Sequence, residues 1–225
     1  MTRGVVFDLD DTLYLEREYV RSGFEHVAGV LGRSPRERRE LAAWLWRAFE
    51  AGVRGDTFDR LLAAHPGLAG RITVTKLVDA YRCHPPDISL LPRVVELLEQ
   101  LRARDIRMGV LSDGPLASQQ AKAAALQLGG WFDPIVFTAS QQEAFAKPGT
   151  MGFEWIAATW GLPNADLAYV ADNPVKDFIG PRKLGWLTLR LRMPKQLPFA
   201  LEPIGNGDQP DVEIGDLPNL LDHLG

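Results

Sequence analysis

Two kinds of hydrophobic spacing divide the chain. Residues 4–9 form a short apolar run, typical of a strand buried on both faces of a parallel sheet. From residue 88 onwards, further runs of strand length predict strands at 107–111, 135–138, 167–171, 186–191 and 212–214. Helical spacing between these runs predicts helices at 92–101, 116–128, 150–161, 176–184 and 217–224, with a loop rich in Pro and Gly at 194–210. This alternation predicts βαβ units and a mainly parallel sheet.

The segment between the first strand and residue 88 has a purely helical pattern. Apolar residues recur every three or four positions and predict helices over 16–31, 36–51, 56–64 and 73–82. The simplest architecture is therefore an α/β core, formed by residues 1–13 and 88–225. An all-helical cap, residues 14–87, would be inserted into this core after its first strand.

The composition narrows the class of protein. The 225 residues are 46% hydrophobic and 24% charged, as in ordinary globular domains. The apolar runs are well short of the roughly 18 residues that a membrane helix needs. Near the start of the chain, carboxylates stand where a signal peptide would have its apolar segment. A cytoplasmic protein without a membrane partner is expected. The net charge of −4 gives no reason to expect a nucleic-acid partner, and the single cysteine excludes an internal disulfide and any multi-thiolate metal site.

The first candidate for chemistry is the segment Asp8-Leu9-Asp10-Asp11-Thr12, directly after the first strand. Ligands of open α/β sheets bind at the carboxyl ends of strands, and strand alternation puts Asp8 and Asp10 on the same side. Two close carboxylates repel unless a cation lies between them or one is protonated. Such a pair can supply a nucleophile and a general acid/base, although a structural turn capped by Thr12 would have the same sequence.

The later strands also end in residues suited to a charged ligand. A hydroxyl and backbone N–H groups at Ser112-Asp113-Gly114 can form an anion cradle. Lys147 supplies a positive charge, and Asp172-Asn173 with Asp177 provides oxygen ligands for a hard cation. Each feature alone has an ordinary explanation, such as a helix cap or a solvated lysine. Together, at one edge of a sheet, they predict a single site.

With its motifs in this order, the chain resembles the haloacid dehalogenase superfamily. Residues 8–12 match the family's DxDxT motif, Ser112 its second motif, Lys147 its third and residues 171–177 its fourth. The helical insert is similar to the family's C1-type cap, and the resemblance implies a Rossmann-like core. Two positions depart from the common pattern, because Ala171 stands where Gly is common and Asp113 where Asn is frequent.

The resemblance implies an Mg²⁺-dependent phosphomonoesterase that acts on a small phosphorylated metabolite. Asp8 would attack phosphorus and form a phosphoaspartate, while Asp10 would act as general acid and then as general base. The Mg²⁺ would be held by the carboxylates of Asp8 and Asp172 and by the backbone carbonyl of Asp10. The phosphoryl oxygens would be bound by Ser112, Asp113 and Lys147, and supporting roles would fall to Thr12, Asn173 and Asp177. Residues 13–90 carry twelve basic and ten acidic side chains, which suits a cap over an anionic substrate.

Two alternatives fit the same motifs. A phosphomutase of the superfamily would use Asp8 and Asp10 but return the phosphoryl group to its substrate. A non-catalytic binding module would have the same fold without the enzymatic activity. The dehalogenase branch lacks a carboxylate at the position of Asp10, because a halide leaving group needs no proton. No pattern in the sequence indicates the individual substrate or the oligomeric state.

Overall fold

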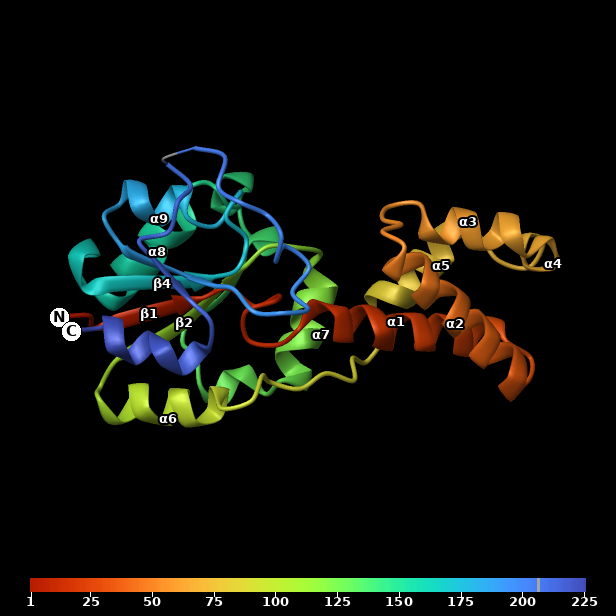
Figure 1. Cartoon of the computed structure of the whole chain (residues 1–225), viewed down its shortest axis with the longest axis horizontal. Coiled ribbons are helices and arrows are strands. Elements are labelled where there is room, and N and C mark those ends of the chain that lie inside the picture. Colours follow the sequence, from red (N-terminus) through yellow and green to blue (C-terminus); the bar gives the residue numbers. More distant parts are fainter. Residues whose placement is uncertain (206) are drawn as a thin grey trace. The chain divides into compact units, whose positions relative to one another are not determined.

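The computed structural model describes residues 1–205 and 207–225, and its contacts divide the chain into two compact units. The first, here called the α/β unit, consists of Met1–Arg17 and Ser89–Gly225. The second, the helical unit, is Glu18–Ile88. Each unit is described by itself (Figure 1). No helix in the described ranges is long and apolar enough to cross a membrane.

The α/β unit is built on a parallel six-stranded sheet of order β3-β2-β1-β4-β5-β6. Its strands are β1 (Gly4–Phe7), β2 (Arg107–Ser112), β3 (Ile135–Phe137), β4 (Leu167–Ala171), β5 (Leu187–Leu191) and β6 (Val212–Ile214). The predicted α/β class and parallel sheet are thereby confirmed. Because β1 pairs with β2 on one side and β4 on the other, the carboxyl ends of these three strands adjoin.

Helices cover both faces of this sheet. In Figure 1, α8 (Met151–Trp160) and α9 (Ile179–Lys183) lie on one face, and α6 (Val94–Ala103) lies on the other with the 3₁₀ segment η5 (Leu217–His223). The remaining elements of the unit are α7 (Leu116–Ala125) and the short 3₁₀ turns η1 (Leu128–Gly130), η2 (Thr138–Ser140), η3 (Glu143–Phe145) and η4 (Asn164–Asp166). The two termini meet, and the backbone N–H of Thr2 donates to the carbonyl of Leu224.

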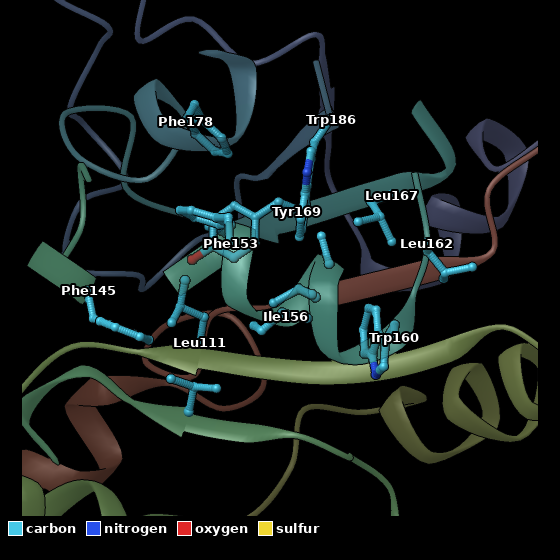
Figure 2. Packing of buried hydrophobic residues seen from close by; sticks show 14 residues of the cluster. Leu111, Phe145, Phe153, Ile156, Trp160, Leu162, Leu167, Tyr169, Phe178 and Trp186 are labelled. Atoms are coloured by element: carbon cyan, nitrogen blue, oxygen red, sulfur yellow. The ribbon is translucent and has the colours of Figure 1, made fainter. Parts of the chain in front are cut away.

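Aromatic side chains dominate the core between α8 and the sheet. Phe153, Ile156 and Trp160 of α8 gather with side chains of β2 and β4 (Figure 2). The ring of Phe153 packs edge-on against Tyr169 at 4.8 Å and against Trp186 at 5.4 Å between centroids. Such pairs add about 0.5–1.5 kcal/mol each beyond their burial. Tyr169 is therefore held rigidly, which matters because its hydroxyl group faces a catalytic candidate.

The helical unit has a hydrophobic core of its own. Its elements are α1 (Glu16–Leu31), which begins in the last residues of the preceding α/β segment, then α2 (Pro35–Glu50), α3 (Thr57–Ala64), α4 (Pro66–Ala69) and α5 (Val74–Arg82). The core is formed chiefly by Val27, Leu41, Leu45, Leu61 and Leu77. The start of α2 shows local sequence control, since Ser34 Oγ accepts from Glu37 N while Glu37 Oε2 accepts from Arg33 N.

Three differences from the predicted elements have a clear local description. The helix predicted over 176–184 begins only at Ile179, because residues 173–178 form a turn closed by the hydrogen bond from Asn173 N to Asp177 Oδ2. The helix predicted over 116–128 ends at Ala125, and Gln127 then adopts a left-handed backbone with φ of 53°. The segment predicted as a helix over 217–224 is a 3₁₀ helix.

Candidate functional site

Asp8 continues the central strand by one residue and carries the carboxylate nearest the middle of the sheet. Its backbone N–H donates to the carbonyl of Val170 at 2.9 Å, which extends the pairing of β1 with β4. The side chain is buried, and Asp8 Oδ1 lies 2.9 Å from Lys147 Nζ. The strand pairing thus fixes the direction of the Asp8 carboxylate, and Lys147 fixes its position.

Lys147 is completely buried and contacts three polar groups. Besides Asp8, its Nζ lies 2.7 Å from Asp177 Oδ1 and donates to the hydroxyl of Tyr169 at 3.0 Å. Burial alone would lower the pKa of Lys147, but Asp177 and Asp8 outweigh burial and hold that pKa well above its usual range. The ammonium group is therefore a permanent, fixed positive charge at the end of β1.

Three buried carboxylates surround this lysine. Asp8, Asp172 and Asp177 each offer an oxygen, and these atoms lie within 4.8 Å of one another. Burial, and then repulsion from Asp177 and Asp8, raises the pKa of Asp172 well above its usual value. One lysine offsets one of the three negative charges. A divalent cation with a preference for oxygen fits this set, because it would offset the remaining two.

The neighbours of Asp172 orient it. Thr12 Oγ1 lies 3.5 Å from Asp172 Oδ1, at the limit of a hydrogen bond. The backbone carbonyl of Asp172 accepts from Arg190 Nε at 3.2 Å, and Asn173 N donates to Asp177 Oδ2 at 3.0 Å. The predicted supporting residues Thr12, Asn173 and Asp177 thus lie together in the structure.

At the end of β2, Ser112 and Asp113 differ in their hydrogen bonding. The Ser112 hydroxyl oxygen is buried and has no hydrogen-bond partner among the described residues, so it is available to a ligand. Asp113 Oδ1 accepts from Thr138 Oγ1 at 2.8 Å and from the backbone N–H of Lys147 at 3.4 Å. These two bonds tie the loop that carries Lys147 to the end of β2. Thr138 was not indicated by the sequence.

Asp10 lies outside the carboxylate cluster, as expected if only its backbone carbonyl is a metal ligand. Its Oδ1 is 2.6 Å from Lys122 Nζ and also accepts from the Tyr14 hydroxyl, while Oδ2 accepts from Gln119 Nε2 at 2.8 Å. Burial would raise the pKa of Asp10, but Lys122 and these hydrogen bonds outweigh burial and lower it. None of these three partners was predicted. The available signal was the pair of polar residues, three positions apart, on the alanine-rich helix α7.

A pocket of about 290 Å³ opens in front of these groups. Its polar lining is Asp8, Asp10, Glu16, Asp172, Asn173 and Lys176, and its apolar lining is Leu197, Pro198 and Leu201. Burial, and then repulsion from Asp10, raises the pKa of Glu16 to about 7. The apolar wall is fixed by hydrogen bonds, since Leu197 N donates to Asp11 Oδ2 and Gln196 Nε2 donates to the carbonyl of Asp11, both at 2.7 Å.

Comparison with known proteins supports this picture. The family of haloacid dehalogenase-like hydrolases matches residues 2–185. Two relatives named glyceraldehyde 3-phosphate phosphatase align over 99% of this chain. The protein from Methanocaldococcus jannaschii is 26% identical with 96% of its own length covered, and the protein from Methanopyrus kandleri is 28% identical with 97% covered.

A solved structure has the same fold. The HAD hydrolase YfnB from Bacillus subtilis, bound to magnesium, has a TM-score of 0.69 at 18% identity, with 100% of this chain and 99% of that chain covered. The family match covers most of the chain, and the motif residues lie together at the carboxyl edge of the sheet, Lys147 on the loop that follows β3. The chain belongs to the haloacid dehalogenase-like hydrolase family.

Proposed function

We propose that this chain is an Mg²⁺-dependent phosphatase of small phosphorylated sugars, acting through a phosphoaspartate on Asp8. The relatives named glyceraldehyde 3-phosphate phosphatase support the substrate class. The observation that carries the proposal is the arrangement around Asp8. Its carboxylate lies 2.9 Å from the fully buried Lys147 and shares one pocket with the carboxylate of Asp10.

In the first half of the reaction, a carboxylate oxygen of Asp8 forms a bond to phosphorus while the bond between phosphorus and the leaving oxygen breaks. The carboxyl group of Asp10 gives its proton to the leaving oxygen, so that an alcohol departs and Asp10 becomes a carboxylate. Lys147 and the hydroxyl of Ser112 bind the phosphoryl oxygens. Phosphoryl transfer is catalysed mainly by such positioning and by neutralisation of charge.

In the second half, water attacks the phosphorus of the phosphoaspartate. Asp10, now ionised, takes the proton of that water, and the bond between phosphorus and the Asp8 oxygen breaks. Inorganic phosphate and the starting forms of both aspartates result. The low pKa of Asp10 in the substrate-free site favours this base role. The phosphate dianion of a bound substrate would raise the pKa of Asp10 and so favour its acid role.

The metal would be held by the carboxylates of Asp8 and Asp172 and by the backbone carbonyl of Asp10. When bound, Mg²⁺ would neutralise phosphoryl charge that the carboxylates alone would repel. Asp177, whose Oδ1 lies 2.7 Å from Lys147 Nζ, would hold Lys147 in place beside Asp8. In this proposal the helical insert, residues 14–87, is a cap that selects the substrate, and residues 1–13 and 88–225 form the catalytic core.

Turnover of p-nitrophenyl phosphate tests the proposal directly. We expect release of nitrophenol and inorganic phosphate by the wild-type protein in Mg²⁺, loss of this activity in EDTA, and background activity in the Asp8→Asn variant. Equal signals in all three samples would contradict a phosphatase. Transfer of the phosphoryl group to a second sugar, without release of phosphate, would favour the phosphomutase instead.

A panel of phosphorylated metabolites, ranked by kcat/KM, tests the substrate class. We expect three-carbon to five-carbon sugar phosphates to rank above nucleotides, because the relatives named glyceraldehyde 3-phosphate phosphatase support a small sugar phosphate as substrate. A clear preference for nucleoside monophosphates would contradict this part of the proposal.

A further inference from the structure

The feature that the proposed mechanism does not use is a second buried lysine, Lys122. Its side chain is 4% exposed, and it lies in the second turn of α7, outside the four motifs. A buried ammonium group is costly unless it is paired. Its Nζ lies 2.6 Å from Asp10 Oδ1, so the residue paired with this charge is the proposed general acid/base.

The helix that carries Lys122 buries a polar face. Most of α7 after Gln120 is alanine, yet its buried positions are the polar residues Ser118, Gln119 and Lys122. Gln119 and Lys122 are three residues apart and therefore share a face of the helix. Both contact Asp10, and Gln119 Nε2 also donates to the carbonyl of Asp113. The helix thus presents two polar side chains to one carboxylate.

The two carboxylate oxygens of Asp10 accept different numbers of hydrogen bonds. A carboxylate oxygen can accept about two hydrogen bonds. Oδ1 accepts from Lys122 and from Tyr14, so both of its acceptor sites are used. Oδ2 accepts from Gln119 alone among the described residues, and one acceptor site remains on it.

Building on the proposed function, we propose that Lys122, aided by Gln119, is a positioning residue that fixes Asp10 so that Oδ2 carries the proton exchanged with the leaving oxygen and with water. Proton transfer requires the donor and acceptor atoms to be about 2.6–3.2 Å apart. An Asp10 side chain that rotates freely would meet this requirement only part of the time. Lys122 acts through Asp10 and does not itself touch the substrate.

The test compares two substrates whose leaving groups differ in their need for a proton. Nitrophenolate leaves readily without one, whereas the alkoxide of glycerol 3-phosphate does not. In the Lys122→Met variant we expect kcat/KM for glycerol 3-phosphate to fall by about 100-fold, and kcat/KM for p-nitrophenyl phosphate to fall by less than about fivefold. The Lys122→Arg variant, which keeps the charge and the donors, is expected to recover most of the glycerol 3-phosphate activity.

The matched control is Lys183→Met, which removes an exposed lysine from α9 and should leave both substrates unchanged. If Lys122→Met fails to fold by circular dichroism, Gln119→Met provides the same comparison, because it removes the contact with Asp10 Oδ2 together with the bond to the carbonyl of Asp113. An equal loss for both substrates in the folded variant, or no loss for either, would overturn the proposal. A wild-type protein inactive on both substrates would instead overturn the proposed function.

Discussion

At the scale of single residues, the site is governed by a shortage of positive charge. Lys147 forms ion pairs with both Asp8 and Asp177, whereas Asp172 has no comparable cationic partner among the described residues. Burial and the neighbouring carboxylates therefore raise the pKa of Asp172. Proteins accept such crowding of carboxylates where the function needs it. The balance of charge, more than any single contact, supports the proposed cation site.

Addition of Mg²⁺ should therefore stabilise the protein through Asp172. At a concentration of about 100 times its Kd, a ligand that binds only the folded state adds about 2.7 kcal/mol, which corresponds to about 5–10 °C in Tm for a chain of this size. We expect this increase for the wild type in calorimetry and less than about 2 °C for Asp172→Asn. The same increase in both proteins would show that the ion binds elsewhere.

Glu16 should make the protein less stable as the pH rises. Its pKa is about 7 in the folded state against an ordinary value of 4.5, so the folded state binds the proton more tightly. The resulting stabilisation is complete below about pH 4.5 and is lost as the pH rises to about 7. After solvent screening the loss is about 1–2 kcal/mol.

The Glu16→Gln variant tests this effect by urea unfolding in EDTA at pH 5 and pH 8. We expect the variant to gain stability relative to the wild type at pH 8 and to show little difference at pH 5. The control is Glu25→Gln, an exposed residue on the same helix. A gain at pH 8 that is no larger than that of the control would contradict the assignment.

At the scale of elements, hydrophobic pattern and turn chemistry predict the frame of the site. Buried apolar runs mark the strands, and the residues that follow β1, β2 and β4 meet because those strands are neighbours. Patterns fail where a contact depends on packing between distant segments. The hydrophobic periodicity does not predict that α7 buries Lys122, or that Thr138 donates to Asp113. Residues 173–178 form a turn because Asp177 accepts a hydrogen bond from the backbone N–H of Asn173, and α9 therefore begins later than predicted. The hydrophobic periodicity does not predict this local hydrogen bond.

The loop after β5 is held from the β5 side by one buried residue, in addition to its bonds to Asp11. Arg190 is buried in β5 and donates to the carbonyls of Asp172 at 3.2 Å, Pro198 at 3.4 Å and Leu201 at 2.7 Å. It therefore joins the loop that forms the apolar wall of the pocket to the backbone of the candidate metal ligand. Removal of its side chain takes this donor from the carbonyls of Asp172 and Leu201, while the carbonyl of Pro198 keeps the backbone N–H of Leu201.

We expect Arg190→Met to lower the free energy of unfolding by about 2–4 kcal/mol and to raise KM, because the wall of the pocket loses its anchor. The control is Arg192→Met, since Arg192 is more exposed and its ion pair with Glu202 is screened by solvent, so that it contributes little to stability. Urea unfolding and steady-state kinetics measure both effects. Similar values for the two variants would refute this role of Arg190.

At the scale of the whole molecule, the chain leaves the α/β unit after Arg17 and returns to it at Ser89. The backbone N–H of Leu91 donates to the carbonyl of Leu13 at 2.9 Å, so the outgoing and returning segments are joined within the α/β unit. Asp11 anchors the outgoing segment, because its carboxylate accepts from the backbone N–H groups of Glu16 and Leu197. A disturbance of the helical core should therefore stop at this junction.

The Leu45→Ala variant tests whether the helical unit can loosen alone. Leu45 is fully buried in the helical core, and such truncations cost about 2–5 kcal/mol. We expect faster amide hydrogen exchange throughout residues 18–88, with unchanged protection of β1, β2 and β4, because local unfolding follows cooperative units. The matched variant Val110→Ala removes a fully buried side chain from β2 and should instead raise exchange across the sheet. Faster exchange in β1 and β4 of Leu45→Ala, equal to that in the helices, would mean that the two units unfold as one.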